Sequence, residues 1–363
     1  MAFLDTYRQQ VALLIRVLPF VAEERAFALK GGTAINLFVR DMPRLSVDID
    51  LTYLPVEDRA TSLAAIDAAM LRIKERIERG IPAVRVNASR SADENIVTKL
   101  IVRASGARIK IEVTPVLRGA VYNPVVMSVV PVVEDAFGFA EMQVVSFADL
   151  YAGKIVAAFD RQHPRDLFDV RGLLANEGVG DELRRAFLVY VISHNRPMAE
   201  VLAPTRKPLG EEFARGFAGM TQEPVALADL DAAREAIIAA MVADMPEDHR
   251  RFLAGFKRGE RIGHFSGYRR PSICPPSCGS SATSPSCPMQ DGANWSMRWR
   301  AFSFPDRNAI EEACPLGVLM LSYPRTPAFP SPPTTPTPCR AHRFGACRRS
   351  RAALRRGWHG RRR

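Results

Sequence analysis

At 363 residues the chain is long enough to form two domains, each with a sizeable hydrophobic core. Its formal net charge of +11 is unevenly distributed, because residues 266–363 contain 16 Arg and only four acidic residues. That segment carries +12, which leaves −1 for the residues before it. The overall charge therefore does not indicate a nucleic-acid or membrane partner.

All six cysteines and all three tryptophans also lie within residues 266–363. A body without cysteine needs no disulfide framework and is typical of the reducing cytoplasm. The N-terminus has no basic segment followed by an apolar run, and no apolar stretch is long enough to cross a bilayer. We therefore expect a cytoplasmic protein without a signal peptide or a membrane partner.

The first predicted elements lead to a glycine turn. Apolar residues at helical spacing predict a helix over residues 4–18, which the following proline should end. A short strand over residues 26–29 then brings the chain to Gly31 and Gly32. These glycines allow the backbone to approach a phosphate closely, and the short helix predicted over residues 33–39 offers an anion its free N–H groups.

The next predicted strand carries two carboxylates. Side chains two positions apart on a strand point the same way, so Asp48 and Asp50 converge while the apolar residues around them face the core. Two carboxylates on a rigid strand suit one or two Mg²⁺ ions that bridge to substrate phosphates. Because Asp is depleted in strands, this pair favours metal binding over a merely polar strand edge.

A third carboxylate belongs to a later strand. A long helix and three strand-like runs are predicted after the Asp pair, over residues 57–79, 96–103, 108–113 and, with interruptions, 121–133. In the second run Glu112 lies on the polar face together with Lys110. Glu112 could join the Asp pair, or it could simply face water on a half-exposed sheet.

From residue 146 the pattern becomes helical. Ser146 begins a capping box in outline and predicts a helix over residues 147–159, which contains Lys154. The next helix, with a proline near its start, carries Asp166 and Asp169 on one face. Taken alone, such charged residues are typical of a solvated helix surface.

Three more helices are predicted, over residues 183–192, 227–241 and 247–256. These patterns give three domains: an α/β core over residues 1–145, a helical domain over 146–260 and a tail over 261–363. The tail is rich in Arg, Pro and Cys, without any amphipathic period, and is predicted to be disordered.

The order of these motifs resembles the signature of the nucleotidyltransferase superfamily. The letters KGGTA at residues 30–34, followed by RLSVDIDL at residues 44–51, resemble more closely the AbiEii/AbiGii toxin family of bacterial nucleotidyltransferases. The resemblance covers about residues 20–260. It implies an α/β (α+β) fold in which a mixed sheet is flanked by helices and followed by a helical domain.

The resemblance also implies a function. The protein would transfer a nucleoside monophosphate from an NTP to an acceptor hydroxyl, with Mg²⁺, and would release pyrophosphate. The implied acceptor is the 3′ end of tRNA. The implied role is the toxin of a toxin–antitoxin or abortive-infection system, with a separately encoded antitoxin as partner.

The resemblance implies a role for each candidate site residue. Asp48 and Asp50 hold Mg²⁺, and Glu112 orients or deprotonates the acceptor. Lys154 contacts the triphosphate and Asp166 completes the catalytic site, with Asp169 as a further candidate. The β- and γ-phosphates are cradled by Gly31, Gly32, Thr33 and Ser46.

Two alternatives remain at this stage. One is a nucleotidyltransferase that acts on a protein or on a small molecule such as an aminoglycoside, because a nearly neutral body does not indicate a long RNA footprint. The other is a non-catalytic nucleotide-binding regulator, against which the intact Asp48/Asp50 pair argues.

The tail has two interpretations. A natural basic tail could bind RNA by stacking Trp and Arg on bases. Alternatively, the reading frame was lost near Arg261, since back-translation of residues 261–280 can give a shifted-frame string that resembles the Trp- and Leu-Pro-containing ending of this toxin family. In that case this copy could be a decaying gene product, and we expect no function from the tail.

Overall fold

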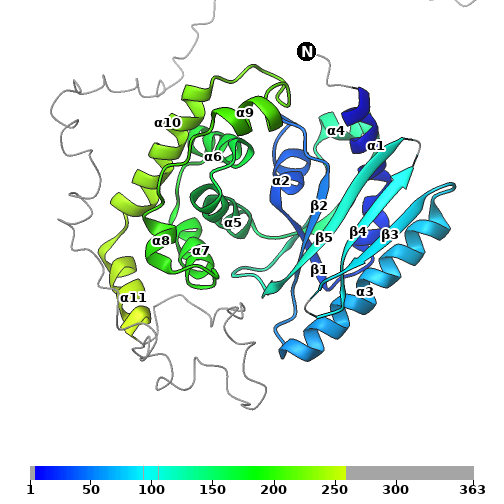
Figure 1. The fold of residues 1–363 in the computed structure, drawn as a ribbon, viewed down its shortest axis with the longest axis horizontal. Coiled ribbons are helices and arrows are strands. Elements are labelled where there is room, and N and C mark those ends of the chain that lie inside the picture. The colour runs from blue at the N-terminus through cyan, green and yellow to red at the C-terminus, as the bar shows by residue number, and fades with distance from the viewer. Residues whose placement is uncertain (1–4, 93, 105, 259–363) are drawn as a thin grey trace, which may run out of the picture. The chain divides into compact units, whose positions relative to one another are not determined.

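The structure, a computed structural model, describes residues 5–92, 94–104 and 106–258. Its centre is a seven-stranded mixed sheet with the order β3-β4-β5-β2-β1-β7-β6 (Figure 1). This confirms the predicted α/β class. The predictions for the tail over residues 261–363, including the lost frame, lie outside the described residues.

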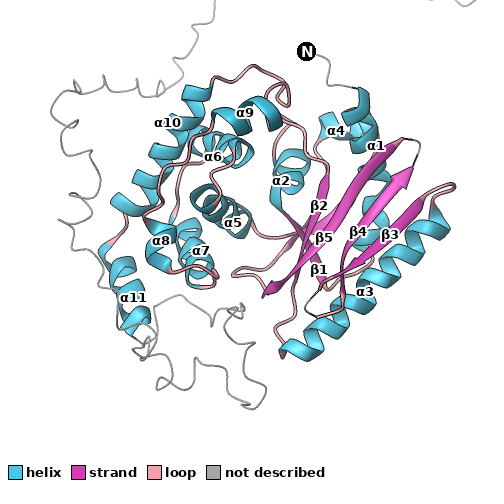
Figure 2. Cartoon of the chain, in the orientation of Figure 1, coloured by secondary structure: helices cyan, strands magenta, loops and turns pink. Residues whose placement is uncertain are grey.

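The strands all belong to the first 144 residues, as far as the structure describes the chain (Figure 2). β2 runs antiparallel to β1 and parallel to β5, while β4 runs antiparallel to both β3 and β5. β7 lies parallel to β1 and antiparallel to β6. The bounds are β1 Phe27–Lys30, β2 Asp48–Tyr53, β3 Arg85–Arg90, β4 Val97–Ala104, β5 Ala107–Arg118, β6 Val125–Ser128 and β7 Glu141–Val144.

Helices flank the sheet and make up the described chain after β7. The early helices are α1 Asp5–Ala22, α2 Gly31–Ala34, α3 Arg59–Gly80 and α4 Pro131–Phe137, with a π-helix at Ile35–Val39. The later ones are α5 Phe147–Asp160, α6 Pro164–Asn176, α7 Asp181–Ile192, α8 Met198–Leu202, α9 Gly210–Gly216, α10 Leu227–Ile238, a π-helix at Ala239–Ala243, and α11 Glu247–Arg258. Among the described residues, no helix is both long and apolar enough to cross a membrane.

The two faces of the sheet differ in what they contact. Helices α1 and α3 pack against β3, β4, β5 and β7. The alternate residues Ile49, Leu51 and Ile111 are fully buried in this core. The side chains between them point to the opposite face, which is where the polar residues of β2 and β5 lie. The apolar face therefore anchors the strands that present the charged face.

Capping residues set the ends of the long helices. Asp58 accepts a hydrogen bond from the backbone N–H of Thr61 at 3.0 Å and starts α3. Ser146 accepts one from the N–H of Asp149, also at 3.0 Å, and starts α5 as its capping box predicts. Asp149 itself is buried and accepts hydrogen bonds from two backbone N–H groups that follow β5.

Some predicted elements were wrong. The first helix does not end before Pro19 but continues to Ala22, because the burial of Leu18 and Val21 outweighs the hydrogen bond that the proline removes. Residues 121–133 are not one interrupted strand: β6 is followed by α4, which begins at Pro131, a favoured first helical residue.

Other elements were not predicted at all. β3 carries mostly exposed polar side chains, so it lacks the alternation that marks a half-buried strand. β7, α8 and α9 are only four to seven residues long, too short to show a period. The proposed boundary between residues 145 and 146 remains a prediction.

Candidate active site

The strand register brings three candidate carboxylates together. β2 and β5 are parallel neighbours in which Asp50 lies opposite Glu112 and Asp48 lies opposite Lys110. Paired residues of neighbouring strands point to the same face of a sheet. Asp48, Asp50 and Glu112 therefore share one face, opposite α1 and α3, although β2 and β5 are far apart in the sequence.

Two lysine side chains contact these carboxylates. The Lys110 Nζ atom lies 2.7 Å from Glu112 Oε2 and 3.6 Å from Asp48 Oδ2. Lys99, opposite Glu112 on β4, places its Nζ atom 3.0 Å from Glu112 Oε1. These lysines were not among the predicted site residues, although the two-residue period of β5 already places Lys110 beside Glu112.

The environment shifts the pKa values of two carboxylates in opposite directions. Burial raises the pKa of Asp50, and the neighbouring Asp48 adds to this effect, while Lys110 and Lys30 oppose it. Burial alone would raise the pKa of Glu112 as well, but hydrogen bonds from Lys110 and Lys99 outweigh it and lower that pKa. Glu112 is thus held as a carboxylate anion, which suits cation binding or orientation better than proton abstraction near neutral pH.

The glycine turn fits closely around the carboxylate strand. Gly31 has a φ of +77°, and a Cβ atom there would lie 2.7 Å from Asp50 Oδ2. A Cβ atom on Gly32 would lie 2.6 Å from Arg44 Nη2 and 2.9 Å from Ser46 Oγ. An alanine at either position would therefore have to displace a side chain of the site, and at Gly31 it would also strain the backbone.

Thr33 and Ser46 are hydrogen-bonded to each other beside this turn. Their hydroxyl oxygens lie 3.0 Å apart, and Thr33 Oγ1 donates to the carbonyl oxygen of Asp48 at 2.5 Å. Thr33 is fully buried, whereas Ser46 is partly exposed. In this structure Thr33 fixes the start of β2, and Ser46 is the better placed of the two to meet a ligand.

Lys154 is almost fully buried and is paired with both acidic candidates of α6. Its Nζ atom lies 2.9 Å from Asp166 Oδ1 and 3.1 Å from Asp169 Oδ2. Asp169 also accepts hydrogen bonds from Arg44, at 2.7 and 2.5 Å, and from Asn36 at 3.2 Å. One buried carboxylate thus connects α6 with α5 and with the segment around the glycine turn.

Asp166 has a second cation beside Lys154. Arg161 donates to it from Nε at 2.5 Å and from Nη2 at 2.9 Å, while the Arg161 side chain itself remains 63% exposed. Burial would raise the pKa of Asp166, but Lys154 and Arg161 outweigh it and hold this pKa well below its usual range. Arg161, which our sequence analysis missed, is close enough to Asp50 to interact with it electrostatically.

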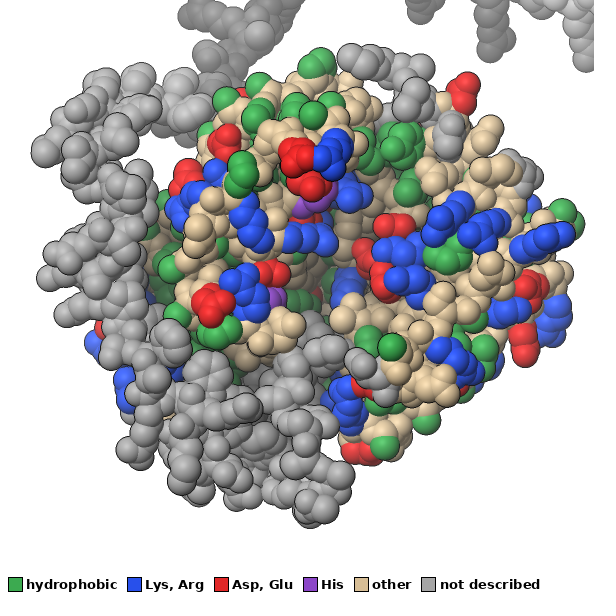
Figure 3. Space-filling model, in the orientation of Figure 1, with side chains coloured by type: hydrophobic (Ala, Val, Ile, Leu, Met, Phe, Trp, Pro, Cys, Tyr) green, Lys and Arg blue, Asp and Glu red, His purple; other side chains and the backbone are tan. Residues whose placement is uncertain are grey.

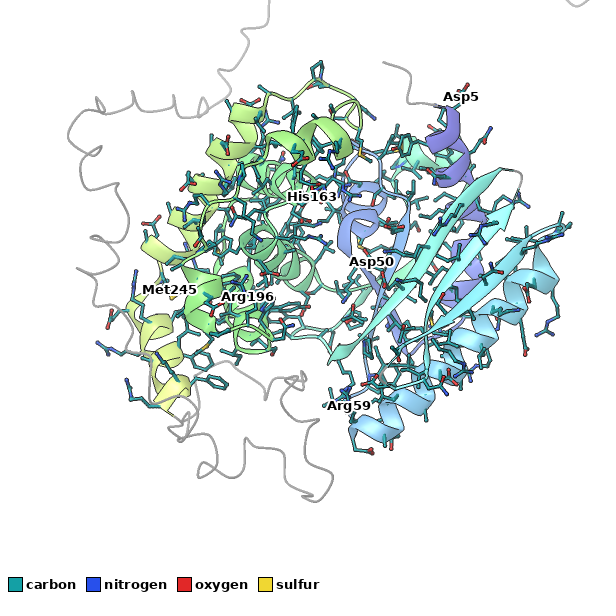
Figure 4. The ribbon with its side chains drawn as sticks, in the orientation of Figure 1. Asp5, Asp50, Arg59, His163, Arg196 and Met245 are labelled. Atoms are coloured by element: carbon teal, nitrogen blue, oxygen red, sulfur yellow. The ribbon has the colours of Figure 1, made fainter. Side chains whose placement is uncertain are left out.

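The surface is hollowed between the helices and the sheet (Figure 3). Figure 3 shows Lys and Arg side chains on both sides of this hollow, over the helices and over the sheet. Figure 4 labels Asp50 on β2 and His163 at the start of α6, on its two sides. His163 accepts a hydrogen bond from the backbone N–H of Arg165 at 3.1 Å, so it caps α6.

The residues present fit a divalent ion that is shared with a substrate. No three His, Cys, Asp or Glu side chains of the described chain meet closely enough to enclose a metal by themselves. Mg²⁺, however, is usually bound by one or two carboxylates, with phosphates and water completing its shell. The Lys110 ammonium already lies where Asp48 and Glu112 can share a cation. Asp48 and Asp50 are the residues that would hold the metal.

The chain matches the family model described as nucleotidyl transferase AbiEii toxin, type IV TA system, over residues 12–272. This match spans well over half of the sequence. The chain belongs to the AbiEii family. It is therefore a nucleotidyltransferase and a toxin of a type IV toxin–antitoxin system, with an NTP as substrate and an antitoxin as partner.

The fold has a solved counterpart. It is similar to MenT4, a nucleotidyltransferase toxin from Mycobacterium tuberculosis H37Rv, with a TM-score of 0.54 and 19% sequence identity. The alignment covers 70% of the AbiEii chain and 89% of MenT4. At this identity the likeness concerns the fold alone. No curated protein matches the chain.

Proposed function

We propose that this AbiEii protein transfers a nucleoside monophosphate from an NTP to the 3′-terminal hydroxyl of tRNA, with Mg²⁺ as the metal. The acceptor oxygen forms a bond to the α-phosphorus while the bond from that phosphorus to the bridging oxygen breaks, and pyrophosphate leaves. The hydroxyl proton passes to a carboxylate or to water. The observation that carries the proposal is the convergence of Asp48, Asp50 and Glu112 on one face beside the glycine turn.

Each residue contributes binding or positioning. Asp48 and Asp50 hold Mg²⁺, which neutralises charge on the triphosphate when it is bound. Gly31 and Gly32 allow the backbone to come near the β- and γ-phosphates, and Ser46 offers its hydroxyl beside them. The ionised Glu112 orients the acceptor hydroxyl rather than acting as a strong base.

The buried network forms the base of this site. Lys154 is charge-paired with Asp166 and Asp169 and lies close enough to Asp50 to influence its ionisation. We assign Lys154 and Asp166 to holding this part of the site in place, with the Lys154 charge acting on the triphosphate through space. Thr33 stabilises the start of β2 through its hydrogen bond to the carbonyl oxygen of Asp48.

The tRNA acceptor is what the family resemblance implies, and an exposed cation beside Asp166 supports it. Arg161 is largely exposed while it is fixed by Asp166, so it presents a positive charge to solvent. A polyanionic acceptor would be attracted to such charges, whereas a small-molecule acceptor would not need them. A protein or an aminoglycoside acceptor is the alternative outcome. The alternative of a non-catalytic regulator is inconsistent with membership of a nucleotidyltransferase family.

Three further features belong to this proposal. The division into a core over residues 1–145 and a helical domain over residues 146–260 would place the nucleotide on the core and the acceptor against the helices. The antitoxin would be encoded by a separate gene. The protein would act in the cytoplasm, where tRNA is found.

The test is transfer of label from each α-³²P NTP, with Mg²⁺, onto total bacterial RNA and onto protein. Wild type is compared with Asp48→Ala and with wild type in EDTA. Label in tRNA that is lost in both controls supports the proposal and identifies the nucleotide. Label in protein alone would mean that the acceptor is a protein. Label that persists in Asp48→Ala would contradict the assigned metal site.

A further inference from the structure

Lys110 lies among the carboxylates that we assign to the metal and the acceptor. Its ammonium group contacts Glu112 at 2.7 Å and lies 3.6 Å from Asp48, and it also interacts electrostatically with Asp50. The side chain is 30% exposed, so the ammonium group is partly withdrawn from water. Lys110 thus interacts with three negative charges on two strands, and Lys30, opposite Asp50 on β1, also interacts electrostatically with Asp50 and Glu112.

Lys110 balances part of the negative charge on the carboxylate face, together with Lys99 and Lys30. Asp50 and Glu112 are neighbours across β2 and β5, and like charges at such a distance repel each other. Lys99 contacts one carboxylate oxygen of Glu112, Oε1. Lys110 contacts the other carboxylate oxygen, Oε2, and is the cation with an ion pair to both Glu112 and Asp48 among the described residues.

We propose that Lys110 is an internal counter-ion of the Asp48/Glu112 pair, and that a divalent cation must displace its ammonium group in order to bind. This inference rests on the proposed metal site at Asp48 and Asp50. It makes Lys110 a positioning residue, because it acts on the metal ligands and not on the reacting atoms. Lys110 would keep the carboxylates assembled while no metal is bound and would set the concentration of free metal that the protein requires.

The position of Lys110 predicts how its removal should change the affinity for the metal. A metal bound to Asp48 would lie within a few ångströms of the ammonium group, so the two cations would repel each other unless the lysine moved away. Removal of the lysine charge should therefore strengthen metal binding. A lysine that merely supported the sheet would give the opposite result or none.

The experiment measures binding of Mn²⁺ alone, without nucleotide, by the EPR signal of free Mn²⁺. Wild type is compared with Lys110→Gln and with Lys99→Gln, which removes a neighbouring charge whose ion pair is with Glu112. We expect Lys110→Gln to lower the Kd for Mn²⁺ about tenfold, and Lys99→Gln to change it by less than about threefold. An unchanged or higher Kd in Lys110→Gln overturns the inference.

A second variant separates this inference from the site on which it rests. Asp48→Asn should abolish Mn²⁺ binding, and if it does so while Lys110→Gln binds like wild type, only the counter-ion role fails. If Asp48→Asn binds Mn²⁺ as well as wild type, the assigned metal site fails and the counter-ion role fails with it.

Thermal melting adds a readout that does not depend on catalysis. Without metal, Lys110→Gln should melt below wild type, and Mn²⁺ should raise its Tm by more than it raises that of wild type. Equal Tm increases in the two proteins would contradict the proposal. If Lys110→Gln does not fold, Lys110→Met keeps the aliphatic part of the side chain without its charge and is measured in the same way.

Discussion

Arg44 and Asp169 form a buried, two-point ion pair across 125 residues of sequence, with Nε 2.7 Å from Oδ1 and Nη2 2.5 Å from Oδ2. Both side chains are at most 3% exposed. A Cβ atom on Gly32 would lie only 2.6 Å from Arg44 Nη2. The pair therefore connects α6 directly to the segment that packs on the glycine turn, so the proposed nucleotide site and the helices that follow the sheet depend on each other.

Breaking this pair should destabilise the protein strongly. Arg44→Met leaves the carboxylate of Asp169 buried with one cation fewer, and we expect a loss of about 3–5 kcal/mol in the free energy of unfolding. Urea denaturation measures it. As a control, Glu247→Gln removes an exposed ion pair with Arg251 and should cost no more than about 0.5 kcal/mol. Similar losses in the two variants would contradict the buried role.

Two glycines with the same backbone strain provide a matched test of the turn. Gly31 and Gly178 have φ values of +77° and +69°, but a Cβ atom at Gly178 meets nothing within 4 Å. Substitution by Ala should cost each protein about 1–2 kcal/mol of stability for the backbone alone. Only Gly31→Ala should also lose nucleotidyl transfer, by about a hundredfold or more, because it displaces the Asp50 carboxylate. Comparable activity in the two variants would mean that contact with Asp50 is unimportant.

Asp50 should show a trade-off between activity and stability. Burial and the nearby Asp48 raise its pKa, so its charge is unfavourable in the folded protein. We expect Asp50→Asn to reduce transfer at least about a hundredfold while leaving the Tm unchanged or higher without metal. Activity and calorimetry on the same preparation measure both effects. A lower Tm would show that the charge of Asp50 stabilises the metal-free fold.

Asp166 should make the protein sensitive to acid. Its pKa is lowered in the folded state, so the stability it contributes is complete above the unfolded pKa of about 3.9 and is lost as the pH falls below that value. Asp166→Asn should reduce the slope of unfolding free energy against pH between about pH 4 and 2.5, by up to about 1.4 kcal/mol per pH unit. Urea titrations at several pH values measure the slope. Parallel curves for wild type and variant would disprove the coupling.

The sequence by itself determined the local features of this protein. The alternation around Asp48 and Asp50 set which side chains share a strand face, and the cap at Ser146 set where α5 begins, because both depend only on neighbouring residues. The resemblance of KGGTA and RLSVDIDL to the AbiEii family was confirmed by the family match over residues 12–272. The same local patterns misplaced the end of α1, where distant packing outweighs Pro19.

Only the tertiary structure decided how the charged residues are paired. The parallel register of β2 and β5 places Lys110 between Asp48 and Glu112, and the packing of α5 and α6 buries Lys154 between Asp166 and Asp169. A lysine on a helix and an aspartate in a first helical turn look like surface residues in a sequence. Their burial depends on cations and carboxylates supplied by other elements, such as Arg44 for Asp169. Long-range charge pairing follows from the whole fold, and no local pattern encodes it.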